Sequence, residues 1–235
     1  MIKWKDKAAD GVAKAVEHNA ALEGMLITGN GGFVAGTRVA TSAGWRVAEK
    51  LRVGDKVLTF DHGMRPIVDI QRETVNVEDG YLPAAQRPVM VPEHALHNSR
   101  ALWLMPEQGM LVESEATLDM LGDPFAIVPA RALQGFRGIN SGIPEGGLQV
   151  TTVAFAHDEV IYVEGGLLAF CPEPRCILTE GISEQDDLYN LLPMSEARPL
   201  VEALIALDDA EALSCDVDEL VGIPDTVRPN RPMLL

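Results

Sequence analysis

The feature that most constrains the fold is the stretch at residues 33–66, FVAGTRVATSAGWRVAEKLRVGDKVLTFDHGMRP. Two β-branched runs, Thr37–Thr41 and Lys56–Phe60, are separated by polar and turn-forming residues, and the turn pair Gly54–Asp55 stands directly before the second run. Runs of this kind bounded by Gly, Asp and Ser predict strands joined by tight turns. The stretch therefore predicts a compact β unit, and the next strand is expected to begin at Pro66–Val68.

Later segments repeat the β pattern. The apolar run Ala101–Met105 predicts a buried strand, and residues 150–164, VTTVAFAHDEVIYVE, predict two strands that are interrupted near Asp158. These segments favour a mainly β fold class. The intervening region from Asn76 to Pro92 is rich in turn residues and is expected to be mostly loop.

Helical patterns stand at the two ends of the chain. Apolar residues at fourfold spacing predict a helix from Asp6 to about Leu22, and further helices are expected to begin at Ser183 and Ser195. The expected organisation is an N-terminal helical segment at 1–28, a β domain at 29–180 and an acidic helical C-terminal tail at 181–235.

The charge of the chain limits its partners. A net charge of −16 argues against a nucleic-acid partner, because binding to phosphate backbones needs clustered Lys and Arg. From Glu180 to Glu219 there are twelve acidic residues and one basic residue, Arg198, and we interpret this region as a solvated surface. The alternative is a docking surface for a basic protein partner. The run Gly29–Gly32 precedes a predicted strand, unlike a dinucleotide fingerprint, so no cofactor is expected.

The sequence also bears on location. It has no apolar run of about 18 residues, so no membrane span is expected. The basic residues at the start are not followed by a long apolar core, so no secretory signal is expected. The odd number of cysteines, Cys171, Cys176 and Cys215, is not typical of a disulfide framework and fits a reducing compartment. These observations predict a cytoplasmic protein.

The stretch at 33–66 resembles the opening block of the Hint domain, the fold shared by inteins and Hedgehog autoprocessing domains, and is most similar to its bacterial branch. The matching structural residues are Phe33, Gly36, Thr37, Leu51, Gly54, Asp55, Val57, Leu58 and Thr59. Two later segments, 104–112 and 126–133, resemble further family blocks in the same order. The resemblance implies a Hint fold and a self-cleaving, protein-splicing type of activity.

The same resemblance exposes three departures at catalytic positions. Gly32 stands where the family has its nucleophilic Cys, Gln108 stands where it has a His, and Thr152 stands where it has a second His. A glycine has no nucleophile, and a glutamine amide has no proton to give near neutral pH. The sequence therefore predicts a Hint domain that has lost its catalytic residues and acts as a structural or binding module.

Two other functions compete with this interpretation. The first is an active autoprotease that uses a displaced nucleophile, with Cys171 or Cys176 as the candidate thiol. The second is a metal-dependent hydrolase built on Glu93, His94 and His97 together with His62. A single His-x-x-His with no recognisable third His or Cys nearby is weak evidence for zinc, so the segment is interpreted as a polar turn and no metal is expected.

Overall fold

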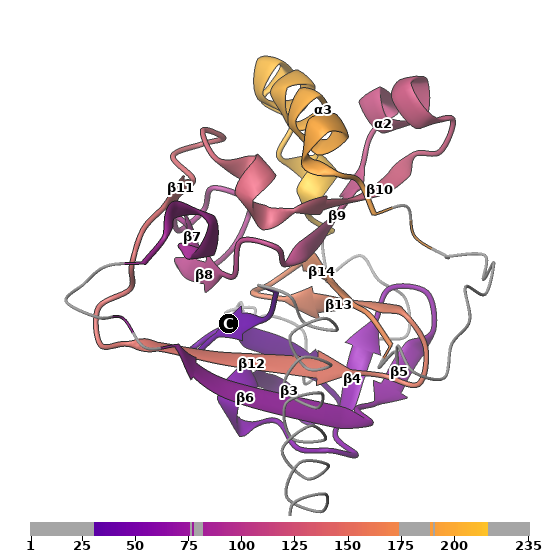
Figure 1. Ribbon diagram of the computed structural model, residues 1–235. Coiled ribbons are helices and arrows are strands. Elements are labelled where there is room, and N and C mark those ends of the chain that lie inside the picture. Colours follow the sequence, from indigo (N-terminus) through magenta and orange to yellow (C-terminus); the bar gives the residue numbers. More distant parts are fainter. Residues whose placement is uncertain (1–30, 76, 78–81, 174–188, 190, 216–235) are drawn as a thin grey trace, which may run out of the picture.

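The computed structural model describes residues 31–75, 77, 82–173, 189 and 191–215. Its strands form two antiparallel sheets, which confirms the mainly β fold class (Figure 1). In spatial order, the six-stranded sheet contains β11 (Asn140–Ser141), β7 (Val89–Val91), β8 (Leu102–Leu104), β1 (Phe33–Val34), β12 (Leu148–Ala154) and β6 (Asp69–Val75). The eight-stranded sheet contains β10 (Phe125–Pro129), β9 (Gly109–Glu113), β14 (Leu167–Cys171), β13 (Glu159–Val163), β2 (Arg38–Thr41), β4 (Lys56–Thr59) and β5 (Gly63–Pro66), with β3 (Gly44–Val47) beside β2.

The opening β unit forms where the sequence predicts it. β2 and β4 occupy the two β-branched runs, and β4 pairs with β5 through the turn at residues 60–62. The expectation that a strand restarts at Pro66–Val68 is wrong, because Pro66 ends β5 and the next strand, β6, begins at Asp69. Ile67 instead donates its backbone N–H to the carbonyl of Asp55 at 3.0 Å, which ties the break between β5 and β6 to the Gly54–Asp55 turn.

The two strands predicted on either side of Asp158 are also present, but they belong to different sheets. β12 pairs with β6 over seven residues in the first sheet, and β13 pairs with β14 over five residues in the second. Val153 and Ile161 are both fully buried in the same apolar cluster. The segment between them therefore carries the chain from one sheet to the other around a shared core.

The described residues also contain short helical elements. These are α2 (Glu115–Leu121), α3 (Met194–Leu207), η1 (Ala48–Lys50), η2 (Ala84–Gln86), η3 (Ala130–Leu133) and η4 (Glu211–Leu213). The helix α2 was not predicted from the sequence, although both of its ends carry common capping residues. The Ser114 side chain accepts the N–H of Thr117, and Gly122 ends the helix at φ 77°.

The helix α3 is packed into the main core. Its residues Leu200, Val201 and Leu204 are buried in the same cluster as the strands of both sheets, and α2 and α3 lie side by side above the second sheet (Figure 1). Leu207, the last residue of the helix, is 71% exposed. The helices predicted at Asp6–Leu22 and at Ser183 lie outside the described residues, so the domain boundaries stay predictions. No helix in the described part of the chain has the length and hydropathy needed to cross a membrane.

Candidate functional site

Gly32 is held at the entrance to the central strand of the first sheet. It directly precedes β1, which lies between β8 and β12. Its backbone N–H donates to the side-chain Oε1 of Gln108 at 2.9 Å, and its carbonyl accepts the backbone N–H of Met105 at 3.3 Å. Both polar groups of this residue are thus satisfied within the fold.

Gln108 uses its whole side-chain amide for structural hydrogen bonds. It is 4% exposed, and besides accepting from Gly32 its Nε2 donates to the carbonyls of Gly109 at 3.0 Å and Phe170 at 2.8 Å. These bonds link β1, β9 and β14, which belong to the two different sheets. The position that resembles a catalytic His therefore holds a neutral amide that joins the sheets.

Thr152 lies opposite Gly32. Phe33 pairs with Thr151 in the antiparallel register of β1 and β12, so the next residue along β12 faces the residue before β1. A Cβ added at Gly32 would lie 2.9 Å from the Oγ1 of Thr152 and 2.6 Å from the Cγ1 of Val150. The structure brings the three predicted positions together, and the place for a side chain on residue 32 is filled.

The backbone conformation of Gly32 also disfavours any residue with a side chain. Its φ is +117°, a value that L-residues rarely adopt. The glycine is therefore suited to its site both by its conformation and by the absence of a Cβ. In this geometry a side chain at position 32 would require a shift of the backbone or of β12.

The residues that resemble the family's structural motif support the turns of the opening unit. Phe33 and Leu51 are buried core residues, and the Thr37 hydroxyl donates to the carbonyl of Val34 at 2.8 Å. Gly36 has a φ of +96° and donates its N–H to the carboxylate of Glu49 at 3.0 Å.

The Gly54–Asp55 pair closes the second turn. Gly54 donates its N–H to the carbonyl of Ile67 at 2.8 Å. Asp55 accepts the N–H of Arg52 and the guanidinium of Arg46, each at 2.9 Å. Six of the nine motif residues named from the sequence thus have a defined packing or turn role.

The residues considered for a metal site do not come together as one cluster. Glu93, His94 and His97 lie in an exposed turn, where His94 Nε2 is 3.3 Å from the Glu93 carboxylate. His62 instead places its Nδ1 3.0 Å from the buried carboxylate of Glu159. Within the described residues no group of three or more His, Cys, Asp or Glu side chains is arranged to hold a metal ion.

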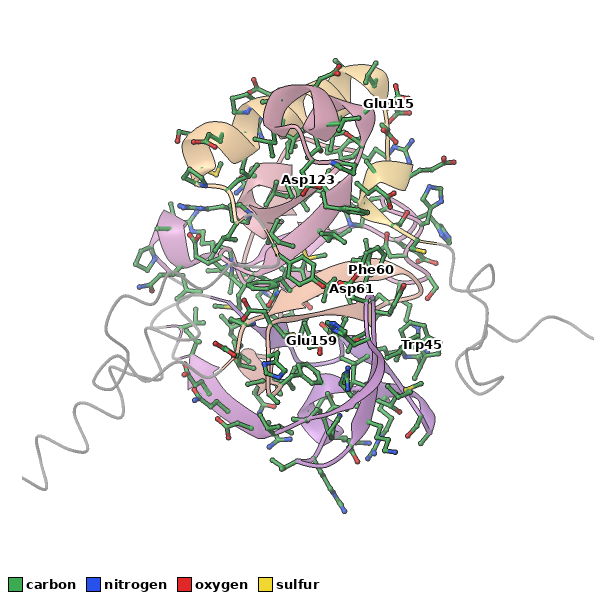
Figure 2. The ribbon with its side chains drawn as sticks, turned by 90° about the vertical axis from the view of Figure 1, so that its right-hand side faces the viewer. Trp45, Phe60, Asp61, Glu115, Asp123 and Glu159 are labelled. Atoms are coloured by element: carbon green, nitrogen blue, oxygen red, sulfur yellow. The ribbon has the colours of Figure 1, made fainter. Side chains whose placement is uncertain are left out.

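A polar cluster around Glu159 was not predicted from the sequence. This residue is 3% exposed, although it stands in a strand of apolar residues. Arg65 lies 3.7 Å from the same carboxylate, and nearby the Tyr189 hydroxyl donates to Asp61. Figure 2 shows Phe60, Asp61 and Glu159 on one side of the molecule. A charged residue at the start of an apolar run is typical of a strand end, so the sequence carries no signal for this burial.

Cys171, the described candidate for a displaced nucleophile, is a poor one. It ends β14 and is buried with 3% exposure. Burial raises the pKa of its thiol, and the nearby Glu159 carboxylate raises it further. Because the thiolate is the nucleophilic form, this surrounding suppresses its reactivity. Cys176 lies outside the described residues.

Glu164 is a second buried carboxyl group that the sequence did not reveal. It is 3% exposed, and its Oε1 accepts the backbone N–H of Arg38 at 2.6 Å. Its other oxygen, Oε2, is buried without a hydrogen-bond partner among the described residues. Burial raises the pKa of this carboxyl, and the Arg38 N–H and the charges of Arg38 and Arg100 oppose the rise.

This raised pKa predicts a pH-dependent effect of Glu164→Gln. The folded state holds the proton more tightly than the unfolded state, so the wild-type carboxyl favours folding below its unfolded pKa of about 4.3 and loses that contribution as pH rises through its folded pKa. The variant lacks this titration. Its free energy of unfolding should therefore increase relative to wild type between about pH 4 and pH 8, measured by urea denaturation. A difference that is constant over this range would contradict the assignment.

Two antiparallel sheets that share a core, with β1 between β8 and β12 in the first sheet, make this protein a mainly β domain. A family model described as Hint domain matches residues 31–168, which is more than half of the chain. The chain belongs to the Hint domain family. No protein among curated sequences matches it significantly.

Two solved structures are similar to the chain. A bacterial intein-like domain from Clostridium thermocellum is 14% identical, with a TM-score of 0.41, and the match covers 60% of this chain and 98% of that one. The AceL NrdHF class 3 split intein, in a glutathione-linked and splice-inactive variant, is also 14% identical, with a TM-score of 0.40 and coverage of 60% and 97%.

Proposed function

We propose that this Hint domain does not cleave the Gly31–Gly32 bond and that it serves as a structural or binding module. The observation that carries the proposal is the hydrogen bond of 2.9 Å between the N–H of Gly32 and the amide of Gln108. The resemblance implies a thiol at position 32 and an acid at position 108. The chain has a glycine and a neutral amide there, and the amide of Gln108 accepts the N–H of Gly32. This arrangement favours a structural role, since the backbone polar groups of Gly32 and the side-chain amide of Gln108 all have partners in the fold.

The chemistry of self-cleavage explains why these residues matter. An N–S acyl shift forms a bond from the thiol of residue 32 to the carbonyl carbon of residue 31 and breaks the amide, while an acid protonates the leaving amine. Gly32 has no atom that could attack, and Gln108 has no proton to transfer near neutral pH. Neither half of the step is available from these two positions.

The displaced-nucleophile alternative gains no support from the described residues. Cys171 is buried, and its thiol pKa is raised by that burial and by Glu159. The His-x-x-His turn likewise offers an exposed pair of groups rather than a converging ligand set. A non-cleaving scaffold remains the function that the geometry supports best.

Restoring the missing groups tests the proposal. Gly32→Cys combined with Gln108→His should release more of a fragment ending at Gly31 in hydroxylamine than either single change, because nucleophile and acid act as a unit. Gly32→Cys alone should release less, since Gln108 has no proton to give to the leaving amine near neutral pH. The products are measured by mass spectrometry, with circular dichroism to confirm folding.

The matched control is Gly32→Ala with Gln108→His, which adds the same Cβ and the same imidazole without a thiol. This control should release no fragment. If the unmodified chain releases the fragment at a rate equal to the restored double variant, the proposed loss of activity is wrong. Release from the alanine control would show that residue 32 is not the attacking group.

A further inference from the structure

One basic groove opens beside the edge of the first sheet. It is a hollow of about 600 Å³, and the basic side chains that line it are Arg46, Lys50, Arg52 and Arg72. They come from β3, η1, the turn after η1 and β6. Its volume is within the range of about 300–1,000 Å³ that is usual for ligand sites. Such a gathering of cations is unexpected in a chain with a net charge of −16.

Most of this positive charge is available to a ligand. Lys50, Arg52 and Arg72 are exposed, and none of them forms an ion pair with a carboxylate among the described residues. Arg72 is positioned by a hydrogen bond of 2.5 Å from its Nη2 to the carbonyl of Leu51. Arg46 is the exception, because its guanidinium pairs with Asp55 at 2.9 Å.

The acidic residue that lines the groove is already engaged. The carboxylate of Glu49 accepts the N–H of Gly36 at 3.0 Å. The apolar residues of the lining are Leu51, Val53 and Ile70, of which Leu51 is buried and Val53 is 62% exposed. The groove therefore offers cations together with a small apolar surface, which suits a ligand that carries both carboxylates and an aliphatic side chain.

β6, which forms one wall of the groove, is an edge strand. β6 pairs with β12 on one side and ends the strand order of the first sheet, so no described strand pairs with its other side. Ile70 and Arg72 are two residues apart on β6 and point to the same face. A free edge with alternating side chains is the surface to which an extended peptide adds as a further strand.

We propose that the groove between η1 and β6 binds an extended acidic peptide segment of a partner protein. The peptide lies along the free edge of β6, its carboxylates meet Lys50, Arg52 and Arg72, and an aliphatic side chain packs on Val53. This proposal rests on the proposed role of the domain as a binding module, and it adds the class of ligand that the module binds. The net charge of −16 disfavours binding of an acidic peptide outside a locally basic surface such as this groove.

The test is a fluorescence-anisotropy titration of the full chain with two labelled peptides. One peptide alternates glutamate and valine, and the other replaces each glutamate with glutamine. The acidic peptide should bind saturably and the glutamine peptide weakly. The affinity should fall as added salt shortens the Debye length from about 30 Å at 0.01 M to about 3 Å at 1 M.

Charge reversal locates the binding site. Lys50 and Arg52 are exposed, and their side chains make no hydrogen bond among the described residues, so Lys50→Glu with Arg52→Glu should leave the fold intact. This double variant should raise the Kd of the acidic peptide by at least about tenfold. The matched controls are Arg87→Glu and Arg100→Glu, combined to give the same change in net charge away from the groove, and they should raise it by less than about twofold.

Three results would overturn the proposal. They are equal binding of the two peptides, an equal loss of affinity in the control variant, and full displacement of the acidic peptide by inorganic phosphate or a single-stranded oligonucleotide at the peptide's own concentration. The last would mean that the groove selects phosphate groups instead of an acidic peptide. Self-cleavage is measured by mass and peptide binding by anisotropy, so failure of this proposal and failure of the proposed function are distinguishable.

Discussion

Gly32→Ala is expected to lower the free energy of unfolding by about 2–5 kcal/mol. A Cβ at this position would lie 2.6 Å from Val150 Cγ1, which is closer than carbon atoms approach without displacement, and 2.9 Å from Thr152 Oγ1. The φ of +117° adds a conformational cost for any L-residue. Because domain stabilities are typically about 5–15 kcal/mol, the change should be large in a urea titration.

Two further variants separate the two causes of the stability loss in Gly32→Ala, which are steric contact with β12 and the positive φ of residue 32. Gly36 has a φ of +96°, but nothing lies within 4 Å of an added Cβ, so Gly36→Ala should lose only the conformational contribution. Val150→Ala should relieve the contact at position 32, so the loss in the double variant should be smaller than the sum of the two single losses. A Gly32→Ala cost no greater than that of Gly36→Ala would contradict the crowded geometry of the site.

Gln108→Leu is the second change with a large expected effect, again about 2–5 kcal/mol of lost stability. The side chain keeps a similar volume, but the N–H of Gly32 and the carbonyl of Phe170 lose their hydrogen-bond partner inside the fold. Each buried group left without a partner costs about 1–3 kcal/mol. The loss is measured by urea denaturation at neutral pH.

The matched control is Gln149→Leu, at an exposed position of β12. It should change stability by no more than about 0.5 kcal/mol, because the glutamine there is on the surface. Gln108→Glu is a sharper probe, since it keeps the acceptor for Gly32 but sets a carboxylate against two carbonyl oxygens. Its stability should recover at acidic pH, where the carboxyl is protonated. If Gln108→Leu is as mild as Gln149→Leu, Gln108 does not join the sheets.

The sequence was most informative where local chemistry determines local structure. The β-branched runs and the Gly54–Asp55 turn predict β2, β4 and the turn between them, because turn residues and β propensity act over a few positions. The error at Pro66–Val68 has a tertiary cause. Ile67 bonds back to the carbonyl of Asp55, and this contact places the break between β5 and β6.

The site was predicted only in part. The order of the family blocks indicates that Gly32, Gln108 and Thr152 belong to one site, and the structure brings them together. The sequence gives no information on the hydrogen bond from Gly32 to Gln108, because the two residues are 76 positions apart. The positive φ of Gly32 and the crowding from Val150 are likewise properties of the assembled strands.

Buried charge and helix packing were the least predictable features. Glu159 and Glu164 frame a strand of apolar residues, and their burial depends on partners from β2 and β5 and the turn before β5. The helix α3 was expected as part of an acidic tail, yet its apolar residues pack into the main core. Helical periodicity identifies the apolar face, but it does not identify the surface that the face contacts.

The most direct test of the central claim is intact-mass spectrometry of the unmodified chain. The purified protein is incubated near neutral pH for several days in buffer, with dithiothreitol and with hydroxylamine, and its mass is followed over time. A Hint domain without a nucleophile at Gly32 should give one species of full-length mass under all three conditions. A fragment that begins at Gly32 or Phe33, increasing with time or with added thiol, would contradict the claim and show that another residue of the chain performs the cleavage.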